Sequence, residues 1–417
     1  MPSPDISAPA TLQTGTFAPF GYPTYRAIWI ANLASNLGSM IQSVAAAWLM
    51  TDLTHSHRLV AMVQSSTTLP ILLFGVLAGA IADNYDRRQV MLWAQGWMLV
   101  VSTALAVMAW QGTMTPALLL AFTLAVGAGL ALNQPAWQAS VRSQVDREIL
   151  PQAITLNAMA FNLARCAGPA LGGLLISVAN VGWAFAVNAV SYVGLIVVLL
   201  RWRPDVQSRK PQPIVPAMAA GLRFCATDSA IRRVLLRGAG LGLGTAGFHA
   251  LVPMVVRGPL HGSEVSLGIL LGLFGVGSVL AAVAVGEIRR RMGVEGAITA
   301  ATLAFVVAQM VLASASTLII AGPAALIAGA GWVSAATTLN VSMQMRSPEG
   351  ILGRCMSIYQ AVTFGAMALG AWIWGTVADW LGLAAALHGA ALWLISSLVV
   401  LRIMAPLPAP PGPRHVV

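Results

Sequence analysis

Residues 181–200 read VGWAFAVNAVSYVGLIVVLL and contain no charged side chain. A helix needs about 20 such residues to cross the hydrocarbon core of a bilayer. Because no water is available there to pair with backbone groups, the segment must satisfy its own hydrogen bonds, and only a helix does so within one segment. The stretch therefore predicts a membrane-spanning helix.

The same pattern recurs along the whole chain, in uncharged runs separated by short connectors that hold almost all of the charge. We expect an all-α membrane protein with twelve transmembrane helices in two pseudo-symmetric bundles of six. The predicted spans are 26–51, 59–83, 90–110, 114–141, 150–178, 181–201, 234–256, 265–287, 296–313, 317–343, 352–377 and 380–402.

The overall composition agrees with a membrane protein. Only 9% of the 417 residues are charged and 58% are hydrophobic, whereas globular chains carry about 25% charged residues. The three cysteines form no Cys-x-x-Cys pair, so neither a disulfide framework nor a metal site is indicated. No P-loop, zinc-protease or serine-hydrolase motif occurs. We therefore predict no enzyme activity, no cofactor and no metal.

The distribution of basic residues sets the predicted orientation. The formal charge is +10, and cytoplasmic loops of membrane proteins carry an excess of Lys and Arg. With the N-terminus in the cytoplasm, all 23 basic residues lie on the cytoplasmic side except Arg58, Arg257 and Arg165. The even number of spans then puts both termini in the cytoplasm. The positive charge serves topology, and we expect no nucleic-acid partner.

A long connector rich in Pro and basic residues divides the chain at 203–231. A Leu-Asn pair that ends at Asn133 recurs at Asn340, at the corresponding place in the second half. We therefore predict an N-terminal tail (1–25), a first six-helix bundle (26–202), a linker (203–231), a second six-helix bundle (232–404) and a C-terminal tail (405–417).

The connector after the second predicted span reads GAIADNYDRR, residues 79–88. It resembles the signature loop of the major facilitator superfamily, G-x-L-x-D-x-x-x-R-R/K. The matching residues are Gly79, Asp83, Arg87 and Arg88. The resemblance implies a cytoplasmic gate in which Asp83 contacts the start of the eleventh span, near 352–354. An Asp at the C-terminal end of a helix is favourable only with a partner, and the candidates are Arg87, Arg88 and the N-terminus of a helix from the other half.

The fifth predicted span contains GPALGG, residues 168–173. It resembles the Gly-Pro-x-x-Gly-Gly motif of antiporters in the same superfamily, carried here by Gly168, Pro169, Gly172 and Gly173. Further runs at 35–42, 133–138 and 162–169 are similar to the transmembrane secretion effectors, the branch that includes the enterobactin exporters. This resemblance implies a multi-pass exporter of the bacterial inner membrane that works by alternating access, with protons as the expected coupling ion and a monomeric assembly.

One charged residue lies well inside a predicted span. Arg165 is about 15 residues into its helix, roughly 22 Å from the cytoplasmic end. None of the thirteen acidic residues lies in the middle of a span. Placing an Arg at the centre costs about 2.5–3.5 kcal/mol on insertion scales. Either carbonyl and amide groups satisfy Arg165, or it faces a wet cavity and meets an anionic substrate.

Polar residues inside the other spans are candidates for lining a substrate cavity, since neutral amides are tolerated in a bundle when they pair. Those we select are Asn36, Gln42, Asn133, Asn157, Asn162, Asn340 and Gln360. The candidates for proton coupling are two acids at the outer rim and two histidines within spans: Asp52, Asp379, His249 and His388.

Three functions remain compatible with these residues. The first is export of a siderophore or another secondary metabolite, which an intramembrane Arg favours. The second is a broad multidrug or macrolide-type efflux pump, which an apolar cavity tolerant of cations would favour. The third is a membrane scaffold without transport, which a lack of alternating access would indicate.

Overall fold

The computed structural model describes residues 17–203, 214–348 and 351–407, and within these ranges it does not describe the side chains of residues 76, 80, 82, 83, 214, 215 and 217. The α-helices are α1 (Pro23–Leu53), α2 (His57–Asn84), α3 (Arg87–Trp110), α4 (Pro116–Ser140), α5 (Leu150–Val178), α6 (Val181–Arg201), α7 (Ile214–Thr227), α8 (Ser229–Arg257), α9 (Glu264–Ser314), α10 (Leu318–Arg346), α11 (Leu352–Leu381) and α12 (Leu383–Met404). Two 3-10 turns precede α1 and follow α4 (Ala18–Gly21 and Val141–Ser143).

Ten of these helices are long and apolar enough to cross a membrane. Two features separate this number from the predicted twelve. Helix α1 spans 31 residues but is not among the ten. Helix α9 counts once, although its 51 residues contain a kink at Gly293, where φ is +71° and two helices meet.

Several helices begin at a polar residue that caps the first turn. The side chains of Ser56, Asp86, Thr115, Asn180 and Asp228 each accept a hydrogen bond from a backbone N–H in the turn that follows. Because the first N–H groups of a helix have no intrahelical partner, such caps fix where the helix starts. The connectors thus hold both the charges and the start signals.

Most helix limits fall within a few residues of the predicted spans. The structure differs from the prediction at two places. Residues predicted as linker form α7 over Ile214–Thr227, and α8 already begins at Ser229. The connector predicted between 287 and 296 is shorter than expected, since the residues on both sides are helical and Gly293, with φ +71° and ψ 177°, is where the two helices meet.

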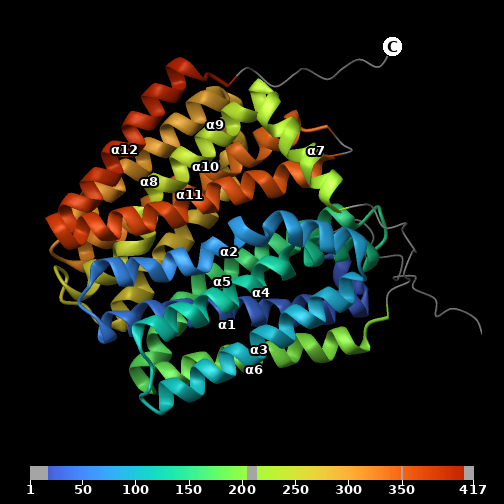
Figure 1. Ribbon diagram of the computed structural model, residues 1–417, viewed down its shortest axis with the longest axis horizontal. Helices are drawn as coiled ribbons and strands as arrows, with labels where there is room; N and C mark the ends of the chain where they lie inside the picture. The colour runs from blue at the N-terminus through green and yellow to red at the C-terminus, as the bar shows by residue number, and fades with distance from the viewer. Residues whose placement is uncertain (1–16, 204–213, 349–350, 408–417) are drawn as a thin grey trace, which may run out of the picture.

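The helices form two groups that lie one above the other in Figure 1, α1–α6 below and α7–α12 above. We call α1–α6 the N-terminal group and α8–α12 the C-terminal group. Consecutive spanning helices run in opposite directions, so the bundle has two ends. The His57 end contains the start of α2 and the end of α11, and the Arg87 end contains the start of α3 and the start of α11.

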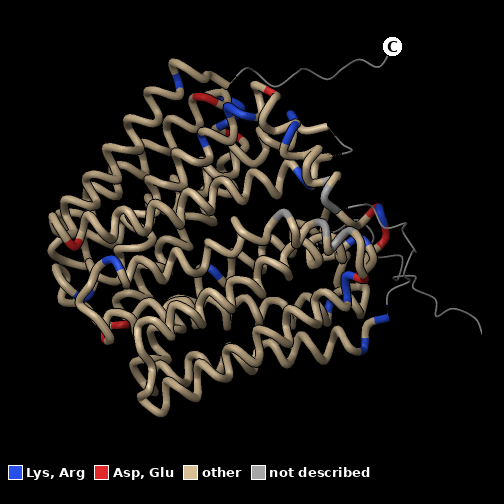
Figure 2. Tube along the Cα trace, in the orientation of Figure 1, with Lys and Arg blue, Asp and Glu red and all other residues tan. Residues whose placement is uncertain are grey.

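The two ends differ in charge. Figure 2 shows the basic residues gathered at the right and upper right, where the Arg87 end lies, and only a few charges at the opposite end. Between the ends the traces are almost free of charge. This distribution is the one that the positive-inside rule expects of a chain crossing a bilayer.

Helices α9 and α10 cross at very short range because glycines stand at the crossing. A Cβ atom on Gly329 would lie 1.9 Å from the carbonyl oxygen of Phe274, and one on Gly277 would lie 1.9 Å from that of Leu326. Small residues let membrane helices approach closely enough for their backbones to touch. This crossing therefore tolerates no side chain.

Gly329→Ala is expected to lower the free energy of unfolding by about 1–3 kcal/mol, because a backbone atom cannot move aside as a side chain would. Thermal unfolding of the purified protein in detergent measures the change. The control is Gly194→Ala on α6, where a new Cβ would meet nothing within 4 Å. Equal unfolding temperatures for the two variants would show that the α9–α10 crossing is looser than described.

Candidate functional site

The two helix groups touch along the interface between α5 and the first part of α9. A Cβ on Gly173 would lie 2.4 Å from the carbonyl oxygen of Glu264, and one on Gly268 would lie 2.6 Å from that of Pro169. Further from the His57 end, a Cβ on Gly275 would lie 2.7 Å from the carbonyl oxygen of Arg165. These contacts join the groups from the His57 end as far as the middle of α5.

The Gly-Pro-x-x-Gly-Gly motif is therefore wedged between two helices. Gly168 and Gly172 face Met40 and Ile41 of α1, in their own group, while Gly173 faces Glu264 of α9 in the other group. Gly168, Pro169, Gly172 and Gly173 are all buried. The motif lets α5 pack closely against both neighbours at once.

Arg165 lies where these contacts reach the middle of the bundle. Its guanidinium carbon is 5.1 Å from the ring centre of Phe274 on α9, at the distance of a cation–π interaction. The side chain is only partly buried. Among the described residues it has no carboxylate partner and makes no hydrogen bond with its guanidinium. A cation of the N-terminal group thus rests on a ring of the C-terminal group, and no described residue accepts a hydrogen bond from it.

His249 of α8 also packs against Phe274. Its ring centre is 5.0 Å from that of Phe274 and 5.5 Å from that of Trp332 on α10. Phe248 and Phe305 lie 5.8 Å and 6.5 Å from it. The Nε2 atom is buried and has no hydrogen-bond partner among the described residues. We call His249, Phe248, Phe274, Phe305 and Trp332 the His249 cluster.

This arrangement combines a cation, an imidazole and aromatic rings at the junction of the two groups. Unpaired guanidinium donors favour an anion, ideally one with two oxygens that match their fork. The four aromatic rings are themselves buried and pack against one another in this conformation, whereas Arg165 is partly exposed. Sequence reasoning identified Arg165 and His249 but missed Phe274, because an aromatic residue in an apolar span carries no signal of its own.

The predicted cavity residues fall into two sets. Gln42 belongs to a buried network, in which its Oε1 accepts hydrogen bonds from Ser102 (2.9 Å) and Asn188 (2.7 Å), joining α1, α3 and α6. Asn157 accepts a hydrogen bond from Tyr25 on α1 (3.2 Å). Both side chains thus brace helices within the N-terminal group.

Asn340 accepts a hydrogen bond from Gln344 on its own helix (2.6 Å). Asn133 is buried, and its Oδ1 has no partner in the described part of the chain. The remaining three amides are partly exposed and make no side-chain hydrogen bond to a described residue: Asn36, Asn162 and Gln360. As cavity residues, all seven amides stay predictions.

The signature loop lies at the Arg87 end. Arg87 donates to the carbonyl of Ala139 (2.7 Å), and Arg88 donates to those of Leu199 (2.7 Å) and Leu200 (2.9 Å), so both arginines tie α3 to neighbours in its own group. A Cβ on Gly79 would lie 3.2 Å from the hydroxyl of Ser357, so α2 meets α11 here. The side chain of Asp83 lies outside the described residues, so its predicted contact stays a prediction.

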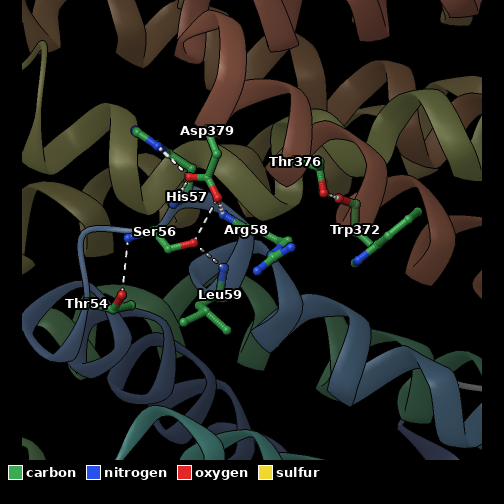
Figure 3. Close-up of polar contacts among 8 residues, drawn as sticks. All are labelled: Thr54, Ser56, His57, Arg58, Leu59, Trp372, Thr376 and Asp379. Atoms are coloured by element: carbon green, nitrogen blue, oxygen red, sulfur yellow. Dashed lines mark hydrogen bonds and ion pairs between the residues drawn. The ribbon is translucent and has the colours of Figure 1, made fainter.

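The candidate proton-coupling residues differ widely in their surroundings. Asp52 at the end of α1 forms an ion pair with Arg257 at the end of α8. Asp379 at the end of α11 binds the start of α2 (Figure 3). His388 is exposed on α12. Both acids therefore connect the two groups at the His57 end, which their sequence positions did not reveal.

Residues 14–410 match the family of transmembrane secretion effectors. The chain belongs to this family. Enterobactin exporters are among its relatives: that of Salmonella typhi is 26% identical over 359 residues, 85% of each chain. This protein is thus a transporter of the major facilitator superfamily and not an enzyme.

Solved structures confirm the fold of the effector at low sequence identity. A peptide-transporter-family (POT) protein in complex with 5-aminolevulinic acid has a TM-score of 0.75 at 12% identity, covering 94% of this chain and 98% of its own. A bacterial homologue of the iron transporter ferroportin in an inward-facing state has a TM-score of 0.68 at 17% identity, covering 91% and 98%. With the apolar helices, the relatives indicate a multi-pass protein of the bacterial inner membrane.

Proposed function

We propose that this effector exports a small anionic molecule across the bacterial inner membrane by alternating access. The observation that carries the proposal is Arg165, a cation at the middle of a membrane helix whose guanidinium has no acidic partner among the described residues. Such a charge is expensive in a bilayer and marks a substrate pathway by default. An anionic substrate would supply the missing partner.

The position of Arg165 supports a role in transport rather than in packing. Substrate sites in this kind of transporter lie near the midplane, at the interface of the two repeats. Arg165 rests on Phe274 of the other group, and the α5–α9 contacts run from it to the His57 end. A substrate held here would contact both helix groups. Movement of one group relative to the other would therefore change the side of the membrane to which the substrate site is open.

The proposal includes twelve crossings and a defined orientation. We count α1 as a crossing and the two parts of α9, on either side of Gly293, as two. The bundles are then 26–202 and 232–404, joined by 203–231. We propose that the Arg87 end and both termini face the cytoplasm, an orientation that the charge asymmetry supports. The contacts described at the His57 end would then close the outer side.

The substrate class follows from the relatives and the site together. The relatives are named as enterobactin exporters, and the Arg165 guanidinium suits a molecule that carries a negative charge. A siderophore or a similar secondary metabolite is the proposed substrate. Protons are the proposed coupling ion, with Asp52, Asp379, His249 and His388 as candidates, and the proposed assembly is a monomer.

Purified protein in proteoliposomes tests the function directly. Enterobactin and the cationic dye ethidium serve as probes, each with and without a pH gradient across the vesicle. We expect protein-dependent movement of enterobactin, faster with the gradient, and little movement of ethidium. Transport of ethidium alone would favour the broad drug pump, and no transport of any tested compound would favour the scaffold. Vesicles without protein give the background.

A further inference from the structure

The start of α2 is held by a carboxylate from the other helix group. Asp379, near the end of α11, accepts hydrogen bonds from the backbone N–H of His57 (2.6 Å) and of Arg58 (3.3 Å) and from the hydroxyl of Ser56 (2.8 Å). The Nδ1 atom of His57 lies 3.1 Å from the same carboxylate. Figure 3 shows Asp379 pointing from α11 into this turn.

Two properties of helices explain why this contact forms. The first N–H groups of α2 have no partner within the helix, and the helix dipole adds partial positive charge there. Ser56 caps only the N–H of Leu59. The carboxylate of Asp379 therefore lies where the free N–H groups and the dipole of α2 both favour a negative charge. At the C-terminal end of α11, by contrast, its charge opposes the dipole of its own helix.

Asp379 thus contributes nothing favourable to α11 and gains its stabilisation from α2. The rest of the pairing agrees with this, since α2 and α11 run antiparallel along their length. A Cβ on Gly375 would lie 2.7 Å from the Cβ of Ala61, and one on Gly365 would lie 2.9 Å from the side chain of Leu72. The carboxylate fastens the His57 end of this pair.

A second link between the groups lies at the same end. Arg257 pairs with Asp52, donates to the hydroxyl of Thr51 (3.0 Å) and lies over the ring of Trp48 (5.2 Å). Its side chain and that of Asp52 are 42% and 41% exposed. Exposed ion pairs contribute little because water screens them. The Asp379 contact has more hydrogen bonds, and its carboxylate is only 25% exposed.

We infer that Asp379 is the latch that keeps the His57 end closed in the described conformation. The inference rests on the proposed alternating access, because only that motion requires the start of α2 to leave α11. Opening at this end must break the contacts to Ser56, His57 and Arg58 together. Without the carboxylate, the open state becomes more populated, by about 10-fold or more for charge-assisted hydrogen bonds.

The test measures access to a residue that the contact covers. Ala61 on α2 is fully buried beneath α11. In a background with Cys166, Cys225 and Cys355 replaced by serine, Ala61→Cys reports opening through its rate of reaction with a membrane-impermeant maleimide. Adding Asp379→Ala is expected to raise that rate at least 10-fold, and Asp379→Asn by less, because the amide oxygen still accepts a hydrogen bond.

The matched control is Glu264→Gln, which removes a carboxylate from the same end. In the described part of the chain the Glu264 side chain makes no ion pair or hydrogen bond, so the control should leave the rate unchanged. General loosening is detected in a chain with Ala61 unchanged, in which Cys166 and Cys225 are replaced by serine and Cys355, fully buried near the Arg87 end, is kept. Its reaction should stay slow in Asp379→Ala.

An unchanged rate at Ala61→Cys in both Asp379 variants, or an equal rise at Cys355, would overturn the latch. The labelling needs no substrate, so its result is separate from the efflux assay. A protein that moves no tested compound and still opens on Asp379→Ala would retain the latch and lose the proposed export. A protein that exports enterobactin while Ala61→Cys is unaffected would retain export and lose the latch.

Discussion

Arg165→Gln is expected to reduce efflux of an anionic substrate by roughly 10- to 150-fold, which corresponds to one charged hydrogen-bonded contact. The glutamine keeps a polar side chain, two bonds shorter than that of arginine, and removes the positive charge. The loss should appear at low substrate concentration, because the contact contributes to binding. Efflux of enterobactin from proteoliposomes measures it.

The Arg165→Lys variant separates charge from geometry. A lysine keeps the cation but loses the planar fork that pairs with two oxygens, so partial activity is expected. Ethidium provides a second comparison, because removing a cation from the site should not hinder a cationic compound. An unchanged apparent affinity for the anion in Arg165→Gln would refute direct pairing and leave Arg165 as a residue that only rests on Phe274.

Gly173→Ala is expected to slow efflux by about 5- to 150-fold. The new methyl group would lie 2.4 Å from the carbonyl oxygen of Glu264, a backbone atom of the opposing helix. Overpacking of this kind costs about 1–3 kcal/mol. Because the contact joins the two helix groups, the cost applies to the state closed at the His57 end. A free-energy change of that size alters the ratio of the closed state to the open state at the His57 end by about 5- to 150-fold.

Two measurements check the Gly173 prediction. Efflux should fall, while the maleimide reaction of Ala61→Cys should rise, because the His57 end spends more time open. Gly96→Ala on α3 is the matched control, since a Cβ there would meet nothing within 4 Å. A loss of efflux without faster labelling would mean that Gly173 affects folding and not the closed state.

The sequence predicted the helix limits well because one physical rule decides them. Charged residues stay out of the hydrocarbon core, so Glu148 marks the start of α5 (Leu150–Val178) and Arg201 marks the end of α6 (Val181–Arg201). The uncharged junction between these two helices is marked instead by the capping residue Asn180. The rule is silent where a helix continues outside the membrane. Helix α7 and the continuation of α9 from residue 287 to Gly293 were missed for this reason.

The site was predicted in part. Arg165 stands out in any apolar span, because its charge has a cost that must be met. Its neighbour Phe274 does not, since one ring among apolar residues looks like any other. Gln42 illustrates a different limit. An amide within a span indicates that the side chain has a hydrogen-bond partner, but the sequence does not say which residue that partner is. Here the partners are Ser102 and Asn188 within the same group.

A cation fixed at mid-depth also makes a carrier sensitive to voltage. Moving one elementary charge through the full membrane potential changes its energy by about 2.3 kcal/mol per 100 mV. If the change between the two open states moves Arg165 relative to the membrane's electric field, the substrate-free protein moves one positive charge through that field when it returns to accept new substrate. A bound monoanion cancels it on the outward stroke. The same arginine would then make the substrate-free half of the cycle the electrically driven one.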